Sequence, residues 1–320
     1  MLNKRLQYIS VQEYTTERGF QLKNFQLSYQ LFGPTLKTAP VVLVNHALSG
    51  NSNVTGSEGW WNDLIGDHRP IDTTRYTVIA FNIPGNGYDG FLIEEYDSFI
   101  ARDIANIFLN GLASLGITKL HSIIGGSLGG GIAWEMICLQ PDLAQHIIPI
   151  ASDWKSTDWL MANCCIQEQL LLNSTKPVHD ARMHAMLCYR TPASFKQRFQ
   201  RSMNETLDIF NVESWLLHHG EKLQERFQQK AYLMMNHLLK HIDVSLKGSA
   251  RDILKKIKAQ IHIIAIDTDL FFTAEESRDI YTVLNRDLQI NYDEIKSIHG
   301  HDAFLIEYEQ LKKIVTPIFK

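Results

Sequence analysis

Four short runs of apolar, strand-forming residues alternate with helical stretches in the first half of this 320-residue chain. They are VVLVNH at 41–46, YTVIAFNI at 76–83, LHSIIG at 120–125 and IIPIAS at 147–152. Strands that are apolar throughout and separated by helices are typical of a parallel sheet with helices on both faces. The alternating run at 20–33 predicts antiparallel strands beside that sheet. We therefore predict an α/β fold with a mostly parallel central sheet.

The residue pattern changes between 156 and 248, where Leu, Met, Gln, Lys and Glu dominate and no convincing strand is found. Strand-like runs return at 259–267 and 288–298. The sheet therefore draws on both ends of the chain. We predict a core formed by residues 1–155 and 249–320, with residues 156–248 inserted as a helical cap.

Composition limits the class of partner. The formal net charge is -4, and Lys and Arg are scattered, so we expect small-molecule substrates, with no nucleic-acid and no membrane partner. The start MLNKRLQYIS lacks the apolar segment of a signal peptide, and no stretch approaches the roughly 20 apolar residues that span a bilayer. We expect a cytoplasmic protein whose four cysteines are reduced thiols.

The stretch IIGGSLGGGIAWE at 123–135 places five glycines around one serine. Its spacing fits neither a dinucleotide fingerprint nor a Walker loop, but it fits G-x-S-x-G, with Gly125, Ser127 and Gly129 between a strand and a helix. Such a tight reversal exposes the serine oxygen, and the Leu128 N–H at the helix start is the expected donor to an oxyanion. On this motif alone, a glycine-rich turn for close packing remains the alternative.

A serine nucleophile requires a histidine base and a carboxylate that orients the base. In proteins with this type of serine turn, the acid and then the histidine follow later in the chain, each just after a strand. DTDLFF offers Asp267 and Asp269, and HGHDAFLIE offers His299 and His301. The pattern of residues alone leaves the choice within each pair open.

The remaining candidate residues lie in an early loop and in the predicted cap. The loop in VVLVNHALSGNSN supplies a second expected oxyanion donor, the Leu48 N–H. His237 and His241 have the i, i+4 spacing of a metal-binding pair, but no acidic ligand is suitably spaced. We interpret this pair as part of a solvated helical face and expect no metal.

Most of the sequence resembles the homoserine O-acetyltransferase family of α/β-hydrolases. NHALSGNSN is similar to the family's HALTG loop, GGSLGG to its GGSMGG turn, DTDLFFTAEE to its D-S-D-x-L-F/Y-P loop, and HGHDAFLIE to its GHDAFL ending. ARMHAMLCYRTPASFKQRF and FNVESWLLHHGEKLQERF are similar to ARMIA…YRSPESFxxRF and FDVESYLxxQGxKFxxRF. The resemblance implies an α/β-hydrolase fold, with a mostly parallel sheet, helices on both faces and an inserted helical cap.

Transferred position by position, the resemblance implies a triad of Ser127 as nucleophile, Asp269 as orienting acid and His301 as base. It implies transfer of an acetyl group from acetyl-CoA, a co-substrate rather than a tightly bound cofactor, to L-homoserine through an acyl-serine. This reaction belongs to methionine biosynthesis.

The same transfer implies three substrate-binding residues. Arg182 would pair with the α-carboxylate of homoserine, Asp302 would meet its α-ammonium group, and Tyr189 would help in the same pocket. The chemistry agrees with these roles, because a guanidinium binds a carboxylate in a bidentate manner. Similar proteins commonly pair through their caps, so a homodimer is expected by analogy.

Departures from the family pattern surround the mouth of the site. Thr273 replaces a proline, Glu168 replaces an arginine, and the chain is shorter near LLNSTKPVHD. These departures keep open an esterase or thioesterase with water as acceptor, and the lack of a donor signature keeps open a homoserine O-succinyltransferase. A non-catalytic binding protein of the same fold is the last alternative, although it would not need an intact triad.

Overall fold

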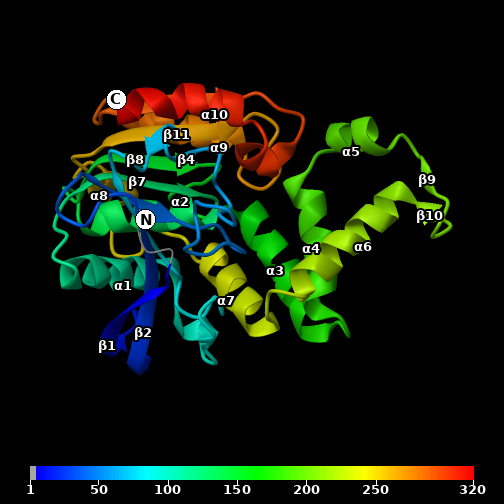
Figure 1. Cartoon of the computed structure of the whole chain (residues 1–320), viewed down its shortest axis with the longest axis horizontal. Coiled ribbons are helices and arrows are strands. Elements are labelled where there is room, and N and C mark those ends of the chain that lie inside the picture. Colours follow the sequence, from blue (N-terminus) through cyan, green and yellow to red (C-terminus); the bar gives the residue numbers. More distant parts are fainter. Residues whose placement is uncertain (1–4) are drawn as a thin grey trace.

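The structure, a computed structural model, describes residues 5–320. Within these residues an eight-stranded sheet has the order β1-β2-β6-β3-β7-β8-β11-β12 (Figure 1). The pairings of β1 with β2 and of β2 with β6 are antiparallel, and the remaining pairings are parallel. The strands are β1 (Gln7–Thr15), β2 (Gln21–Phe32), β3 (Val41–Asn45), β6 (Thr77–Phe81), β7 (Leu120–Gly126), β8 (Ala144–Ile150), β11 (Gln260–Ile266) and β12 (Ile290–Ile295).

Burial along the strands explains this arrangement. Every residue of β3 and β6 is buried, as expected for central parallel strands covered on both faces. Strand β1 alternates partly buried and exposed residues along most of its length, because one face of the outer strand pair is open to solvent. The predicted mostly parallel α/β sheet is thus confirmed, including the antiparallel strands beside it.

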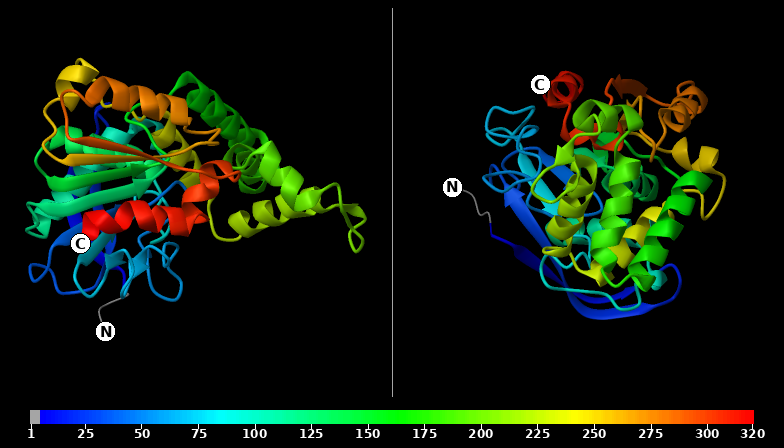
Figure 2. Two further views of the ribbon diagram at one scale, coloured as in Figure 1. Left: turned by 90° about the horizontal axis from the view of Figure 1, so that it is seen from above. Right: turned by 90° about the vertical axis from the view of Figure 1, so that its right-hand side faces the viewer.

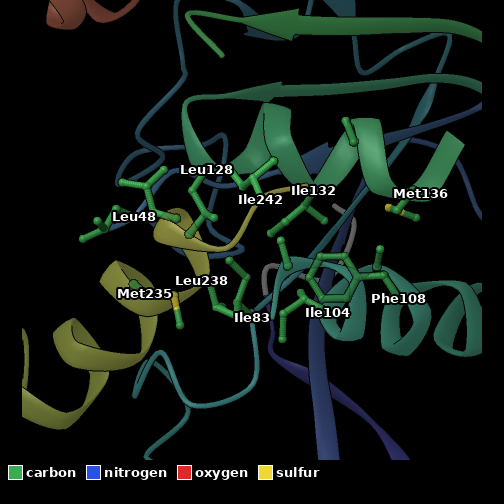
Figure 3. Packing of buried hydrophobic residues seen from close by; sticks show 14 of the residues in the cluster. Leu48, Ile83, Ile104, Phe108, Leu128, Ile132, Met136, Met235, Leu238 and Ile242 are labelled. Carbon is green, nitrogen blue, oxygen red and sulfur yellow. The ribbon is translucent and has the colours of Figure 1, made fainter. Parts of the chain in front are cut away.

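Helices cover both faces of the sheet. In Figure 1, α10 (Tyr308–Val315) lies above the sheet, and α1 (Ala101–Ser114) and α2 (Leu128–Leu139) lie below it. Figure 3 shows the apolar core on the α1 and α2 side, where Ile132 of α2 and Phe108 of α1 are fully or almost fully buried. The short helices α8 (Ala250–Leu254), η1 (Tyr96–Ser98), η2 (Gly300–Leu305) and η3 (Thr316–Phe319), with α9 (Ala274–Leu284), complete the layers.

We call residues 156–248 the cap segment. Its helices lie beyond one end of the sheet, to the right in Figure 1, and are α3 (Asp158–Asn173), α4 (Pro177–Tyr189), α5 (Pro192–Phe199), α6 (Asn211–Gln224) and α7 (Gln229–Lys240). Two of them begin at a threonine cap, since the Thr157 side chain accepts from the Leu160 N–H and the Thr191 side chain from the Ser194 N–H. Helix α7 also packs against α2 through residues such as Met235 and Leu238 (Figure 3).

The prediction that the cap segment contains no strand is wrong. Strands β9 (Met203–Asn204) and β10 (Ile209–Phe210) pair as a hairpin at the far tip of the segment (Figure 2). Each strand is only two residues long, which is too short to give an alternating pattern. Two further two-residue strands, β4 (Ile65–Gly66) and β5 (Ile71–Asp72), pair elsewhere in the chain. No helix among the described residues has the length and apolar character needed to cross a bilayer.

Candidate active site

Ser127 occupies a strained position between β7 and α2. Its φ of 55° and ψ of -125° are unusual for a residue with a side chain and cost about 1–3 kcal/mol. Its N–H donates to the Ile150 carbonyl at 2.9 Å, which ties the turn to the neighbouring strand. A Cβ at Gly129 would lie 2.3 Å from the Asn45 carbonyl oxygen, so the turn closes this tightly only with glycine there. The expected strand, serine turn and helix are therefore present, but the prediction that the turn exposes the serine is wrong, because Ser127 is only 4% exposed.

The structure pairs Asp269 with His301. His301 Nδ1 lies 2.7 Å from Asp269 Oδ2, and the side chains are 4% and 0% exposed. Asp269 follows β11, and His301 lies in η2 after β12. The other Asp269 oxygen, Oδ1, accepts from the N–H groups of Phe271 at 2.7 Å and Phe272 at 2.9 Å. These donors fix the orientation of the carboxylate beside the imidazole.

The alternative aspartate and histidine of each predicted pair have other partners. Asp267 Oδ1 accepts from the Ser297 N–H at 3.0 Å, and His299 Nδ1 lies 3.0 Å from Ser194 Oγ. The first contact joins two loops and the second joins a loop to α5, and neither involves the Asp269 carboxylate. Within each pair, geometry therefore favours the residue that the resemblance implied.

An aromatic shell surrounds His301. Ring centroids of Tyr189, Phe271, Phe272 and Phe304 lie 5.2 to 5.8 Å from the His301 ring. Phe304 also lies against the serine turn, because a Cβ at Gly126 would be 2.6 Å from its ring. The same ring therefore contacts the imidazole and the residue before Ser127, which brings base and nucleophile into one region.

Of the two expected oxyanion donors, Leu128 is the first residue of α2, and Leu48 lies close to it in Figure 3. Leu48 and Leu128 are 7% and 0% exposed and belong to the same apolar core (Figure 3). In the described part of the chain, neither backbone N–H donates a hydrogen bond to the protein. A buried N–H without an acceptor is costly, so both groups suit a developing negative charge.

Arg182 and Tyr189 extend from α4 toward the base. The Arg182 guanidinium carbon lies 5.5 Å from the Tyr189 ring centroid, and that ring lies 5.4 Å from the ring of His301. Burial raises the pKa of Tyr189 well above its usual value, so its hydroxyl stays neutral. One aromatic ring thus separates an arginine from the candidate base, and no carboxylate of the described residues forms an ion pair with this arginine.

Asp302 has a partner that the sequence analysis did not single out. Arg190 Nε donates to Asp302 Oδ2 at 2.9 Å, and each side chain is 16% exposed. The Arg190 guanidinium also lies 5.9 Å from the Trp215 ring centroid. An ammonium group at Asp302 would therefore share the carboxylate with Arg190.

Arg226 is a second residue that sequence reasoning missed. Its Nη1 donates to the Ser49 carbonyl oxygen at 3.0 Å, which links the turn after α6 to the residue that follows Leu48. Arg226 lies in the ERF end of a quoted motif, but the two bonded residues are 177 positions apart, so no local pattern could reveal the contact.

The histidine pair of the cap segment is not a solvated face. His237 is 8% exposed, its ring lies 4.1 Å from that of His241, and its Nε2 lies 3.3 Å from an Arg18 nitrogen. Burial, followed by the His241 charge, lowers the pKa of His237 to about 3. The prediction of solvent exposure is wrong for His237 because α7 packs against the core. The described residues contain no group of three or more His, Cys, Asp or Glu placed to hold a metal ion.

The sequence is similar to proteins of known families. Residues 40–235 match the family model described as the alpha/beta hydrolase fold. Homoserine O-acetyltransferase of Chloroherpeton thalassium is 32% identical over 334 residues, covering 96% of this chain and 86% of the relative.

Solved structures show the same architecture. Homoserine O-acetyltransferase from Bacillus anthracis superimposes with a TM-score of 0.89 at 18% identity, over 99% of this chain and 97% of the other. Esterase E22 superimposes with a TM-score of 0.88 at 19% identity, over 99% and 100%. At these identities the structural likeness shows the fold alone, while the nearly full-length sequence similarity carries the closer relationship. This chain belongs to the homoserine O-acetyltransferase family of α/β-hydrolases.

Proposed function

We propose that this protein is an acyltransferase that moves an acetyl group from acetyl-CoA to the hydroxyl of L-homoserine, a step of methionine biosynthesis. The proposal rests mainly on one arrangement of side chains, in which the Tyr189 ring lies next to both Arg182 and His301. It places an unpaired guanidinium, suited to an α-carboxylate, one ring away from the candidate base. Membership of the homoserine O-acetyltransferase family supports the same substrates.

In the first half-reaction, His301 removes the proton of Ser127, whose oxygen attacks the acetyl carbonyl carbon of acetyl-CoA. The N–H groups of Leu48 and Leu128 bind the oxyanion that forms. The carbon–sulfur bond then breaks, and the CoA thiolate takes the proton from His301. Asp269 keeps His301 in the required tautomer and stabilises the imidazolium.

In the second half-reaction, His301 removes the proton of the homoserine hydroxyl, which attacks the acetyl-serine ester. The ester bond to Ser127 breaks, its oxygen recovers the proton, and O-acetylhomoserine leaves. Arg182 binds the carboxylate of homoserine, Asp302 binds its ammonium group, and Tyr189 walls the pocket. Acetyl-CoA is a co-substrate in this scheme, and the scheme requires no tightly bound cofactor.

Water competes with homoserine for the acetyl-serine, so the acceptor site must exclude solvent. The cap segment, which carries Arg182 and Tyr189, would both bind homoserine and limit water. Small molecules are then the partners of the site. Residence in the cytoplasm and a homodimer formed through the cap segment remain predictions.

The test is an assay of purified protein with homoserine and, separately, acetyl-CoA and succinyl-CoA. We expect thiol release from acetyl-CoA to accelerate with homoserine, the product to have the mass of O-acetylhomoserine, and S127A to release no thiol above background. Greater turnover of succinyl-CoA would instead make the protein a homoserine O-succinyltransferase.

One observation favours a second candidate, an esterase or thioesterase with water as acceptor. Asp302 Oδ2 already accepts from Arg190 Nε at 2.9 Å, so an ammonium group would have to share this carboxylate, which weakens the support for an amino-acid acceptor. Thiol release at the same rate with and without homoserine, and no acetylated amino acid among the products, would establish this second function.

A further inference from the structure

His46 lies two residues before Leu48 and has no role in the mechanism above. Its ring is buried at the end of β3, with 1% of the residue exposed. We propose that His46 is a positioning residue that polarises the peptide group between Ala47 and Leu48, and thereby strengthens the Leu48 N–H as an oxyanion donor. This inference rests on the proposed acyl-serine mechanism, in which that N–H stabilises the oxyanion.

The hydrogen bonds at His46 Nε2 identify it as the acceptor nitrogen. The Ile83 N–H donates to Nε2 at 3.0 Å, and a main-chain N–H can only donate. The Asn86 amide nitrogen lies 3.3 Å from the same Nε2, while the Asn86 amide oxygen accepts from the Tyr88 N–H. Nε2 therefore faces two donors and carries no proton.

The hydrogens of the ring follow from this assignment. Burial lowers the pKa of His46 to about 4, so the imidazole is neutral near neutral pH and carries one N–H. That N–H must be on Nδ1, which lies 2.8 Å from the Ala47 carbonyl oxygen. A carbonyl oxygen only accepts, so Nδ1–H donates to Ala47, and the contacts at both nitrogens require the same tautomer.

The carbonyl of Ala47 and the N–H of Leu48 belong to one peptide group. Resonance couples the two ends, so a donor on the oxygen draws electron density away from the nitrogen and makes its N–H a stronger donor. The Gly50 N–H also donates to the Ala47 oxygen, at 2.9 Å. These two donors also fix the plane of the peptide and hence the direction in which the Leu48 N–H points.

Two substitutions test the roles of the two His46 ring nitrogens one at a time. In H46N the side-chain amide nitrogen occupies the place of Nδ1 and keeps a donor for the Ala47 carbonyl, but the Ile83 N–H loses its acceptor. In H46Q the longer side chain can keep an acceptor for the Ile83 N–H, but the donor to Ala47 is lost. H46N removes the acceptor of the Ile83 and Asn86 donors, and H46Q removes one of the two donors to the Ala47 carbonyl, so we expect both variants to have a lower Tm than the wild type.

The experiment measures kcat and KM of both variants for acetyl transfer to homoserine and for hydrolysis of p-nitrophenyl acetate. We expect kcat of H46Q to fall roughly tenfold or more below that of H46N in both reactions, with similar KM values. Equal kcat values, or a lower kcat for H46N, at comparable Tm would show that His46 only holds the fold together.

A spectroscopic measurement keeps the inference testable if a variant does not fold. In ¹⁵N NMR of the wild-type protein labelled at histidine, we expect protonated Nδ1 and unprotonated Nε2 for His46, and the opposite tautomer would overturn the proposal. Failure of the wild type to make O-acetylhomoserine would instead reject the proposed function, while ester hydrolysis by the variants would still test His46.

Discussion

The Asp269 carboxylate receives three hydrogen bonds, two from main-chain N–H groups and one from His301. This number of donors distinguishes it from Asp267, which is only two residues away and accepts from the Ser297 N–H. One short acidic motif can therefore contain both the carboxylate proposed to orient His301 and a second carboxylate that joins two loops.

Replacing Asp269 by Asn tests this distinction. In D269N the side-chain amide presents a donor to His301 Nδ1, which then takes the wrong tautomer for accepting the Ser127 proton. We expect kcat to fall about 10⁴-fold, as is typical of a catalytic triad whose histidine is held in the wrong tautomer. D267N is the matched control, and a comparable loss of kcat in D267N would contradict the assignment.

Removing the guanidinium of Arg182 tests acceptor binding. In R182Q the α-carboxylate of homoserine loses a charge-assisted hydrogen bond, so we expect KM for homoserine to rise roughly 10- to 100-fold. Hydrolysis of p-nitrophenyl acetate, which needs no carboxylate site, should change little. R201Q removes an exposed arginine of the cap segment as a control, and an equal rise in KM there would point to a general charge effect.

The start of α2 lies unusually close to β3. A Cβ at Gly129 would meet the Asn45 backbone at 2.3 Å, whereas a Cβ at Gly131 would meet the end of the flexible Ile242 side chain at the same distance. The first obstacle is fixed main chain, and the second can rotate away. The cost of a methyl group should therefore differ sharply between two glycines on one helical turn.

Comparison of G129A with G131A measures this difference. Overpacking against rigid surroundings costs about 1–3 kcal/mol, so we expect G129A to lose that much free energy of unfolding and G131A clearly less. Urea denaturation of both variants gives the two values. Equal losses would mean that α2 can move away from β3, and that Gly129 is not required for the close approach.

The strands illustrate what the sequence could and could not predict. The apolar runs of β3, β6, β7, β8 and β11 were predictable because buried parallel strands have a strong local signature. The β9 and β10 hairpin has only two residues in each strand and gives no such signature. The bonds of Arg190 to Asp302 and of Arg226 to Ser49 span 112 and 177 positions, so only the folded chain brings these residues together.

A row of histidines crosses the sheet near the starts of three neighbouring strands. His121, His146 and His262 come from β7, β8 and β11, and His146 Nδ1 lies 3.2 Å from His262 Nε2. Burial lowers the pKa values of His121 and His262 to about 4. Unfolding returns them toward the ordinary 6.5, so stability from these groups is present above about pH 6.5 and is lost as pH falls toward 4.

The H262N variant isolates this contribution. The carboxyls of Glu135 and Asp153, whose pKa values burial raises to about 7, change stability in the opposite direction over part of this range, but they are common to both proteins. We expect the wild type to lose on the order of 1 kcal/mol more than H262N between pH 7 and pH 5. Urea unfolding at both pH values measures the difference, and identical losses would contradict the expectation.

The hydrogen bond from Arg226 to Ser49 has a consequence for the timing of the reaction cycle. Arg226 belongs to the cap segment, which carries the proposed acceptor-binding residues, and Ser49 adjoins Leu48, whose N–H is a proposed oxyanion donor. A movement of the cap segment away from the sheet would break this bond. The loop that carries Leu48 and Ser49 would then keep its contact with Arg226 only while the cap segment is closed over it. Formation of the acetyl-serine and binding of the acceptor would then both require the closed position of the cap segment. An enzyme with an open cap segment would therefore hydrolyse little acetyl-CoA.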